Sequence, residues 1–325
     1  MTLDEVLEPI KTELIQFETH LQNILVSKVG LITDVTAHIN SNSAKRLRPS
    51  VMFLVANAIG EINQKIHTSA AMIEILHTAT LLHDDVVDNA ERRRGKLSVN
   101  AKWNNRIAVL VGDFLFARAM KPITENNDFS GFMKIIAPAT EQMIEGELLA
   151  IQLSDSLDFN EKNYLDIIFY KTASLISAAC KASVMAITDD ENLMNVFAEY
   201  GKNVGMAFQM RDDIFDYSSN SNHIGKPVGN DIREKKITLP LIFALNNSSK
   251  EEQSEILKLI QKRNIIDIEI KRVIDFAVAK GGIEYTTNKA NEYSQNAIDY
   301  LDILPDSEAK TALLNFAKFV VSRDK

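Results

Sequence analysis

The sequence predicts an all-α fold, judging from which residues are rare and how the apolar ones are spaced. Glycine and proline, the residues that interrupt helices, number only 12 and 7 in a chain of 325 residues. Neither occurs in residues 62–94 or 147–200, where apolar residues recur at helical spacing, as at Ile66, Ala70 and Ile73. The alternation of Val, Ile and Thr that marks strands is infrequent. We therefore expect helices along most of the chain.

The helical stretches follow one another without a segment that has the composition of an interdomain linker. The most irregular segment, residues 218–231, clusters Ser, Asn, Gly and Pro and is interpreted as a loop between two helices. From about residue 255 onward, the spacing of apolar positions predicts amphipathic packing helices. We predict a single domain over residues 1–325. Its helices are punctuated by Pro49, Pro122, Pro138, Pro227 and Pro240.

Composition narrows the classes of function. The formal net charge of -8 argues against sequence-independent binding of nucleic acid, which needs a basic surface. The single cysteine, Cys180, excludes an intrachain disulfide and a thiolate metal cluster. Residues 1–8 are acidic and lack the basic flank and apolar stretch of a secretory signal. Because no uncharged apolar run approaches the ~20 residues that span a bilayer, we expect a cytoplasmic protein with no transmembrane segment and no nucleic-acid partner.

The first of two aspartate clusters lies near the end of the stretch 62–94. Asp84 and Asp88 are four residues apart, so on a helix they share one face, one turn apart. Like charges at this spacing repel and weaken a helix by about 0.2–0.5 kcal/mol. Two carboxylates on one face, with Asp85 beside them, therefore suggest that a cation sits between them.

The same Asp-Asp-x-x-Asp spacing recurs at Asp212, Asp213 and Asp216. Oxygen ligands in this arrangement suit Mg²⁺, which is usually shared between one or two carboxylates and the phosphates of a substrate. Either cluster alone could be a solvated acidic helix face. Two copies of one five-residue spacing favour a metal site.

Basic segments accompany the two clusters. Arginine offers bidentate hydrogen bonds to phosphate oxygens, and lysine offers a compact point charge. Each segment alone could be an ordinary helix terminus or a solvated loop. In an acidic protein that also carries paired aspartates, together they indicate a site for a metal-bound polyanion. They lie at residues 45–49, 92–96, 170–173, 225–227 and 231–236.

These motifs resemble those of the trans-isoprenyl diphosphate synthase family, and the resemblance extends from Lys45 to the C-terminal helices. The family pattern Asp-Asp-x-x-Asp-x₄-Arg-Arg-Gly matches residues 84–95, and Gln-x-x-Asp-Asp-x-x-Asp matches residues 209–216. The Gly-Lys-Pro loop matches residues 225–227, and Lys-x-Thr-Leu-Pro matches residues 236–240. One departure is Ala44, where the family usually has Gly before Lys45; we expect little consequence, since Lys45 and Arg48 are retained.

The resemblance implies an isoprenoid synthase-type helical bundle around a deep central cavity, a homodimer, and a role for each motif position. Mg²⁺ would be bound by Asp84, Asp85, Asp88, Asp212, Asp213 and Asp216, with Asp85, Asp213 and Asp216 in supporting positions. The allylic diphosphate would also contact Arg93, Lys171, Thr172, Gln209, Lys226 and Lys236. The diphosphate of isopentenyl diphosphate would be held by Lys45, Arg48, His77 and Arg94. For His77 a packing role is the alternative, although it lies about two turns before Asp84 on nearly the same face.

The implied reaction is ionisation of an allylic diphosphate such as farnesyl diphosphate, condensation with isopentenyl diphosphate, and elimination of a proton. In the family, an aromatic residue four or five positions before the first Asp blocks chain growth. Here these positions are Thr80 and Ala79, and because both are small, a long product of about C40 is implied. Residues 77–85, 111–114 and 145–147 look most similar to bacterial octaprenyl-type members, which make quinone side chains. We expect Met120 and Ile136 to form the floor of the product tunnel.

Two other functions remain open from the sequence. A class I terpene cyclase is also helical and magnesium-dependent, but it would usually lack the second Asp-Asp-x-x-Asp and the isopentenyl-diphosphate residues. A non-catalytic partner subunit would keep the fold and typically lose aspartates from the motifs. Both motifs are complete here, which favours a catalytic synthase.

Overall fold

The computed structural model describes residues 1–40, 46–93, 95–156, 160–217 and 228–323, and nearly all of their regular structure is helical. The described residues form two compact units. The first comprises residues 1–137, 178–198 and 303–316, and the second comprises residues 138–177, 199–302 and 317–325. Helices α8, α10, α11 and α17 contribute residues to both units. We treat each unit by itself.

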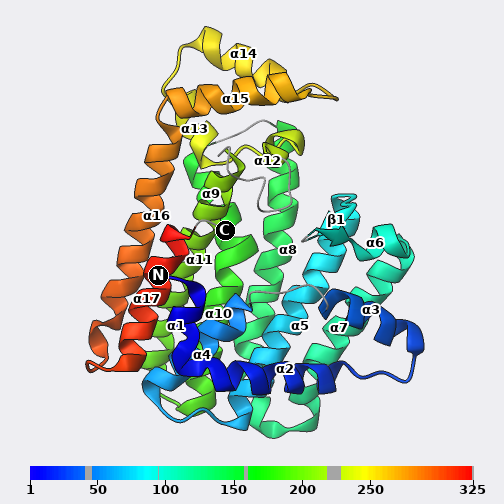
Figure 1. The fold of residues 1–325 in the computed structure, drawn as a ribbon, viewed down its shortest axis with the longest axis vertical. Coiled ribbons are helices and arrows are strands. Elements are labelled where there is room, and N and C mark those ends of the chain that lie inside the picture. The colour runs from blue at the N-terminus through cyan, green and yellow to red at the C-terminus, as the bar shows by residue number, and fades with distance from the viewer. Residues whose placement is uncertain (41–45, 94, 157–159, 218–227, 324–325) are drawn as a thin grey trace. The chain divides into compact units, whose positions relative to one another are not determined.

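The elements that lie wholly in the first unit come from the N-terminal part of the chain (Figure 1). They are α1 (Leu3–Leu7), η1 (Glu8–Ile10), α2 (Lys11–Leu25), α3 (Gly30–Asn40), α4 (Leu47–Ile59), α5 (Gln64–Val87), β1 (Arg92–Arg93), β2 (Lys96–Leu97), α6 (Val99–Lys102), α7 (Asn105–Glu125) and η2 (Asn127–Phe129).

The remaining elements complete the second unit or belong to both. They are α8 (Met133–Ser156), α9 (Glu161–Ile168), η3 (Phe169–Ala173), α10 (Ser174–Ile187), α11 (Glu191–Asp216), α12 (Asn230–Arg233), α13 (Leu239–Asn246), α14 (Lys250–Ile260), α15 (Asp267–Ala279), α16 (Gly282–Asp299), η5 (Tyr300–Ile303) and α17 (Glu308–Ser322). Helices α14 to α17 confirm the prediction of amphipathic helices in the C-terminal part of the chain.

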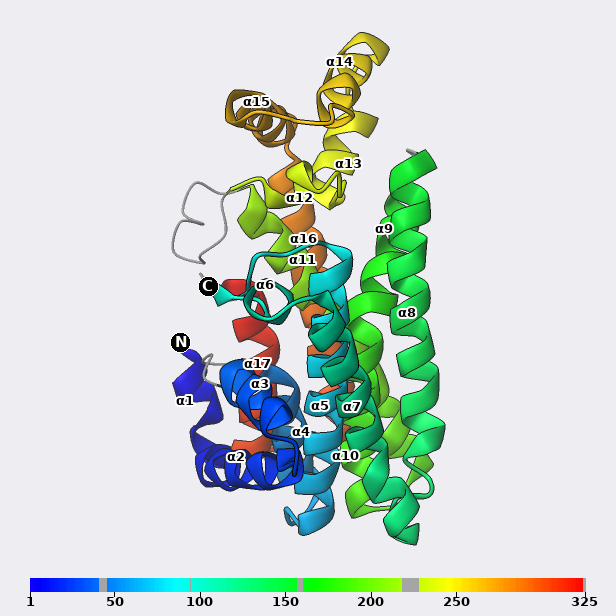
Figure 2. The same cartoon turned by 90° about the vertical axis from the view of Figure 1, so that its right-hand side faces the viewer.

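Helix α5 is the central element of the first unit. It begins at Asn63, whose side chain accepts a hydrogen bond from the backbone N–H of Ile66 at 3.1 Å and so caps the helix. Its first half is buried on nearly all sides, since it packs against α2, α4 and α7. Figures 1 and 2 both show α5 running beside α7. Beyond residue 76, α5 becomes less buried towards its C-terminal end.

A short antiparallel hairpin follows α5. It pairs Arg92 with Leu97 and Arg93 with Lys96. The chain reverses near Gly95, whose φ of +78° lies in the left-handed region that glycine adopts without steric cost. Among the described residues these are the only strands, so the all-α prediction is confirmed. The hairpin also shows that Arg92 and Arg93 lie beyond the helix terminus, not in it.

The second unit is organised around α11 and the π-helical turn η3. The chain runs from α9 through η3 into α10, and π-helical turns of this kind are rare and frequent at functional sites. Helix α11 approaches this turn closely at Gly205, where a Cβ atom would lie 2.6 Å from the Cα of Ala173. A buried apolar cluster from α9, α11 and α13 to α16 supports both elements.

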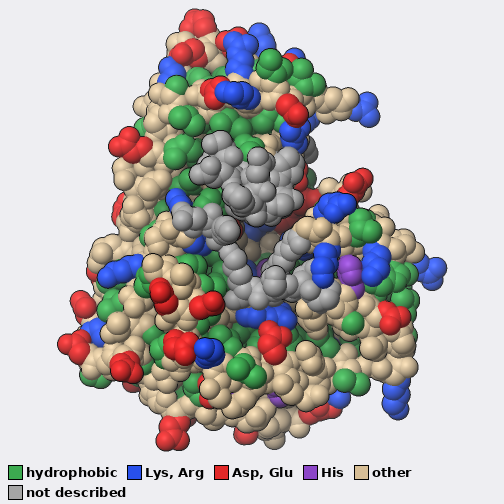
Figure 3. Space-filling view, viewed as in Figure 1, with side chains coloured by type: hydrophobic (Ala, Val, Ile, Leu, Met, Phe, Trp, Pro, Cys, Tyr) green, Lys and Arg blue, Asp and Glu red, His purple; other side chains and the backbone are tan. Residues whose placement is uncertain are grey.

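One helical stretch, Glu161–Ile187, is long and apolar enough to cross a membrane by length and composition alone, and 61% of its most apolar window is buried. Burial of that extent is what a core helix of a folded domain shows. On the face seen in Figure 3, acidic and basic side chains of the described residues are interspersed, as the modest net charge of -8 suggests.

Candidate active site

The first aspartate motif lies at the C-terminal end of α5. The helix ends at Val87, and Asp88 is its C-cap, with a backbone N–H that donates to the carbonyl of Asp84 at 2.8 Å. The helix macrodipole favours a cation at this end and disfavours carboxylates. Two acidic residues in the last turn and a third at the C-cap, with no basic residue in that turn, therefore weaken the helix unless a cation is supplied.

The three carboxylates of this motif differ in their surroundings. Asp85 is 2% exposed and accepts a hydrogen bond from Nε of Arg93 at 2.8 Å. Its buried charge is thus balanced by a guanidinium from the β1 strand. Asp84 is half-buried and Asp88 is exposed, so these two present the more accessible oxygens.

A pocket of about 50 Å³ opens beside this motif, within the first unit. It is lined by His77, Asp85 and Arg93, together with Arg46 and Glu74. The structure therefore brings together three of the residues that the sequence predicted for diphosphate or metal contact. Arg48 lies half-buried in the first turn of α4. The predicted residues Lys45, Arg94 and Lys226 lie outside the described residues.

A glycine of α7 allows close packing next to the motif. A Cβ atom at Gly112 would lie 2.3 Å from Nε2 of His83, so glycine leaves room for this ring in the position that it occupies. His83 stacks on Phe116 and approaches Asp113 Oδ1 at 3.4 Å. The residue before the first aspartate is thus held by α7, which helps to fix the motif's orientation.

The second aspartate motif lies at the C-terminal end of α11, again with no basic residue in the last turn. Asp213 is 5% exposed and receives two hydrogen bonds from neutral donors. Tyr164 donates its hydroxyl to Oδ2 at 2.7 Å, and Gln209 donates Nε2 to Oδ1 at 2.9 Å. Thr172 in turn donates to Oε1 of Gln209 at 2.7 Å. The predicted residues Thr172, Gln209 and Asp213 therefore form one hydrogen-bonded chain.

The charge of Asp213 is only partly compensated by these contacts. Burial raises the pKa of Asp213 to about 7, against the lowering effect of the bonds from Gln209 and Tyr164. The neighbouring charges of Asp212 and Asp216 raise it further. Without a cation, this carboxyl group therefore keeps its proton to a higher pH than an ordinary aspartate does.

Asp216 stabilises the start of α12, the helix that follows α11. Its two carboxylate oxygens accept the backbone N–H groups of Asn230 at 2.9 Å and Asp231 at 3.0 Å, so it caps the short helix α12. The turn into α12 passes through Gly229 at φ +74°. This capping places Asp231 on the wall of the same cavity as Asp213. Burial, together with the charges of Asp213 and Asp216, raises the pKa of Asp231 well above its ordinary value.

Asp212 is partly accessible, with 40% of its side chain exposed. Its Oδ1 accepts a hydrogen bond from Nη2 of Arg323 at 2.5 Å. The guanidinium of Arg323 also lies over the ring of Phe208 at 4.0 Å. Arg211 donates two hydrogen bonds to the Arg323 carbonyl, at 3.0 and 2.9 Å. The C-terminal end of the described chain is thus fastened to α11 at the motif.

The turn η3 supplies one of the basic side chains of this unit's cavity. Lys171 lies in the π-helical turn and forms an ion pair with Glu147 of α8. A Cβ atom at Gly146 would lie 2.6 Å from the Cβ of Tyr170, so this glycine permits the close approach of α8. The cavity has a volume of about 210 Å³ and its polar wall includes Lys171, Thr172, Gln209, Asp213, Asp231 and Lys236.

The residues present fit the Mg²⁺ that the sequence motifs imply. Asp84, Asp88 and Asp212 offer carboxylate oxygens, the ligand type that hard cations prefer, at helix ends where a positive charge is favoured. Mg²⁺ normally takes one or two carboxylates and completes its shell with phosphate oxygens and water. Across the described ranges, no three His, Cys, Asp or Glu side chains are gathered closely enough to hold a metal ion by themselves.

Comparison with known proteins decides the family. Residues 29–277 match the model of the family described as polyprenyl synthetase. The chain belongs to the polyprenyl synthetase family. It is 35% identical over 327 residues to octaprenyl diphosphate synthase of Escherichia coli, which covers 100% of both chains. It is 36% identical over 320 residues to a geranyl-diphosphate-specific all-trans-nonaprenyl-diphosphate synthase of Rhodobacter capsulatus, covering 98% of this chain and 97% of the relative.

The structural comparison agrees with this family. A crystal structure of polyprenyl synthase from Caulobacter crescentus, complexed with calcium and isoprenyl diphosphate, superposes with a TM-score of 0.93 at 34% identity. The match covers 100% of this chain and 98% of that one. The predictions of a trans-polyprenyl diphosphate synthase enzyme and of the isoprenoid synthase-type helical fold are therefore confirmed. The single-domain prediction stays a prediction.

In this polyprenyl synthetase, the positions predicted to control chain length all belong to the first unit. Ala79 is fully buried on α5, and Thr80 is half-buried and donates its hydroxyl to the carbonyl of His77 at 2.8 Å. Met120 of α7 is half-buried, and Ile136 of α8 is fully buried. Their roles remain predictions.

Sequence reasoning missed four residues that the structure places at the motifs. Tyr164 holds Asp213, Asp231 lines the same cavity, Arg323 pairs with Asp212, and Arg46 lines the pocket with His77. Asp231 and Arg46 lie within basic segments that the sequence singled out, so that proximity was a usable signal. For Tyr164 and Arg323 there was none, because their partners lie 49 and 111 residues away in the chain.

Proposed function

We propose that this protein is a long-chain trans-prenyltransferase that condenses isopentenyl diphosphate onto an allylic diphosphate, farnesyl diphosphate being the expected primer. The proposed product is a polyprenyl diphosphate of about C40 for quinone side chains. The observation that carries the proposal is the pair of Asp-Asp-x-x-Asp motifs. Each lies at the C-terminal end of a helix, with a pocket beside it of about 50 Å³ for the first motif and about 210 Å³ for the second.

The proposed metal is Mg²⁺, with Asp84 and Asp88 as proposed ligands in the first motif and Asp212 as a proposed ligand in the second. Its chemistry would be to neutralise charge on the departing diphosphate. The polyprenyl synthase of Caulobacter crescentus is complexed with calcium and isoprenyl diphosphate, which supports a divalent cation and a diphosphate acting together in this family. The remaining aspartates, Asp85, Asp213 and Asp216, would help to position the metal ligands. Their oxygens already accept hydrogen bonds from Arg93 (to Asp85), from Tyr164 and Gln209 (to Asp213) and from the backbone of α12 (to Asp216).

The basic residues would orient the substrates and stabilise charge that develops on ionisation. Lys171 and Lys236 line the cavity of the second unit, and Arg93 and His77 line the pocket of the first. Fixed donors of this kind act without reorganising at the moment of reaction. Apolar side chains such as Ile168 and Ile242 in the same cavity lining would keep water from the allylic cation. The departing diphosphate would accept the proton that is lost.

Long products are proposed from the size of the side chains on α5. Ala79 and Thr80 are small, so the tail of the product would pass them, with Met120 and Ile136 as the proposed floor. The similarity to an octaprenyl and a nonaprenyl diphosphate synthase supports long chains as against short ones.

A homodimer is proposed from an exposed apolar stripe on α8. Ile144, Leu148 and Ile151 recur at helical spacing and are 54%, 62% and 45% exposed. Contiguous apolar surface of this kind often marks a protein interface. We also propose that the protein is cytoplasmic. Light scattering should give the mass of two chains, and Leu148→Glu should give the mass of one.

The deciding experiment incubates purified protein with farnesyl diphosphate, labelled isopentenyl diphosphate and Mg²⁺, and resolves the products by chain length. We expect a ladder that ends at about C40 and is abolished by EDTA. A stop after one or two additions would keep the enzyme class and refute the open tunnel. Incorporation no greater than in an Asp84→Ala control would instead favour a non-catalytic partner subunit.

A further inference from the structure

Arg46 begins α4 in an uncommon backbone conformation. Its φ of +46° lies in the left-handed region, which non-glycine residues adopt only when their surroundings hold them there. It sits within the basic segment 45–49, two residues before Arg48. Something must therefore hold the chain in this turn.

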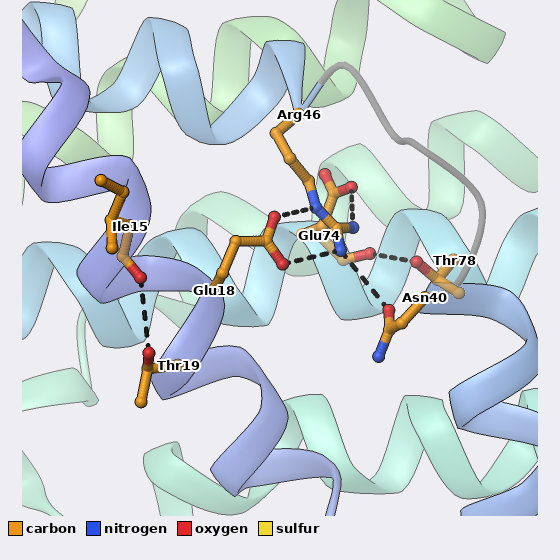
Figure 4. A network of polar contacts seen from close by, with 7 residues as sticks. All are labelled: Ile15, Glu18, Thr19, Asn40, Arg46, Glu74 and Thr78. Atoms are coloured by element: carbon orange, nitrogen blue, oxygen red, sulfur yellow. Dashed lines mark hydrogen bonds and ion pairs between the residues drawn. The ribbon is translucent and has the colours of Figure 1, made fainter.

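The side chain of Arg46 provides that restraint (Figure 4). Its Nε and Nη2 donate to the two carboxylate oxygens of Glu18, at 2.6 and 3.1 Å, in the paired geometry that only a guanidinium offers. Its Nη1 donates to Glu74 at 2.8 Å, and Nη2 reaches Asn40 at 3.4 Å. The turn is thus tied to three helices, α2, α3 and α5.

This network borders the pocket of the first unit. Arg46 and Glu74 line it together with His77, and Glu74 precedes His77 on α5 by three residues, about one helical turn. Arg48, which the family resemblance assigns to isopentenyl diphosphate, lies in the same turn of chain as Arg46. The bond from Arg46 to Glu74 therefore ties the start of α4 to α5, the two helices that carry the described isopentenyl-diphosphate residues Arg48 and His77.

Arg46 is poorly suited to bind a phosphate itself. Its donors are directed at two carboxylates and an amide, and one guanidinium with two carboxylates has a net charge of -1. A diphosphate would have to displace Glu18 and Glu74 and leave a nearly buried Glu74 without its cation. The contribution of Arg46 is geometric.

We propose that Arg46 is a positioning residue for isopentenyl diphosphate, and that Glu18 of α2 acts on that substrate through it. Glu18 lies on α2, before residues 29–277, the part of the chain that the family model matches. The inference rests on the proposed function and names a determinant of its second substrate.

The test compares two variants with a matched control on the same helix. Glu18→Gln removes one ion-pair partner of Arg46, at a side chain that is 42% exposed. Arg46→Lys keeps the charge and loses the paired hydrogen bonds to Glu18. Both should raise the KM for isopentenyl diphosphate about tenfold and leave the KM for farnesyl diphosphate within about twofold. The control is Glu13→Gln, which removes another contact from α2 to α5, to His67 at 2.9 Å, ten residues before His77.

Glu13→Gln should leave both KM values unchanged, even where it lowers the melting temperature. Calorimetric titration with isopentenyl diphosphate alone provides a readout that needs no turnover. If the wild type neither binds nor incorporates isopentenyl diphosphate, the proposed function fails. If the wild type does both and Glu18→Gln behaves like Glu13→Gln, the positioning role alone is overturned. Should Arg46→Lys fail to fold, the partly exposed Glu18 variant still decides the question.

Discussion

Asp85 and Asp213 occupy the same place in two copies of one motif, and their buried carboxylates are stabilised differently. Asp85 is paired with the guanidinium of Arg93 at 2.8 Å. Asp213 is held by the neutral donors Tyr164 and Gln209. One buried charge is balanced by the protein, and the other is only hydrogen-bonded.

The neighbours of Asp213 increase this difference. Asp231 lines the same cavity, and the pKa values of both carboxyl groups are raised, first by burial and then by acidic neighbours. A buried charge without a partner is costly. The comparison teaches that the buried aspartate of the second motif depends on a bound cation for its charge balance more than the buried aspartate of the first motif does, although the two sequences are alike.

The largest expected effect is on catalysis. Asp84→Asn and Asp212→Asn should each lower kcat by about 10³-fold at saturating Mg²⁺, because each removes the charge of an accessible carboxylate that is a proposed metal ligand. Steady-state kinetics with farnesyl diphosphate measures this. Asp128→Asn, an exposed acidic residue in η2, should match the wild type. Equal kinetics for Asp212→Asn and Asp128→Asn would remove the second motif from the proposed site.

A substitution on α5, the helix that carries the first motif, should change the length of the product. Ala79→Tyr on α5 should shorten the product and leave the first condensation intact, because a large ring replaces a methyl group on the proposed path of the tail. Chromatography of labelled products checks this. Ala79→Ser, which stays small, should keep the long product. Since Ala79 is fully buried, a tyrosine variant that unfolds, or that makes the wild-type product, would contradict a tunnel at this position.

A third contrast concerns stability without metal. Asp85→Asn should lower the free energy of unfolding by about 1–3 kcal/mol, because Arg93 loses its buried partner. Asp213→Asn should raise it at pH 8, because an unbalanced charge is removed. With a folded pKa of about 7 against an ordinary value of 3.8, folded Asp213 binds more protons than unfolded Asp213 between these values. The stabilisation of the folded state that goes with protonated Asp213 is therefore lost as the pH rises from about 4 to 7.

Denaturant unfolding in EDTA at pH 5 and pH 8 measures this contrast. The wild type should lose more stability between the two pH values than Asp213→Asn does, and Mg²⁺ should restore more of it at pH 8, where the carboxylates are deprotonated. Identical pH profiles for the two proteins would show that Asp213 is charge-balanced by groups other than those named here.

The smallest effect is expected from Arg323. Arg323→Met should lower the free energy of unfolding in EDTA by about 1 kcal/mol, since its partner Asp212 is partly exposed. It should also let Mg²⁺ saturate the enzyme at a lower concentration, because the guanidinium no longer competes for the carboxylate. A Mg²⁺ titration of activity tests this, with Arg323→Lys as the charge-preserving control. A higher Mg²⁺ requirement in Arg323→Met would mean that the arginine orients Asp212 for the metal.

Local patterns in the sequence were enough to predict the helices and the motifs. Helix formation follows from the spacing of apolar residues and the scarcity of glycine and proline over short stretches, as in 62–94, most of which is α5. The acidic clusters could be assigned to helix ends and to Mg²⁺ because four-residue spacing and ligand type are properties of a few neighbouring residues. The family resemblance then supplied the reaction, which the comparisons support.

The partners of those residues were decided by the tertiary structure. That Asp85 pairs with Arg93, that Asp213 is held by Tyr164, and that Arg46 ties α2 to α5 depends on side chains that packing brings together. The sequence determined the kind of protein and the positions of its acidic and basic groups. Only the tertiary structure determined which buried carboxylates are paired with a cationic side chain and which depend on a bound cation. The reason is that burial and charge pairing depend on distances in space between residues far apart in the chain.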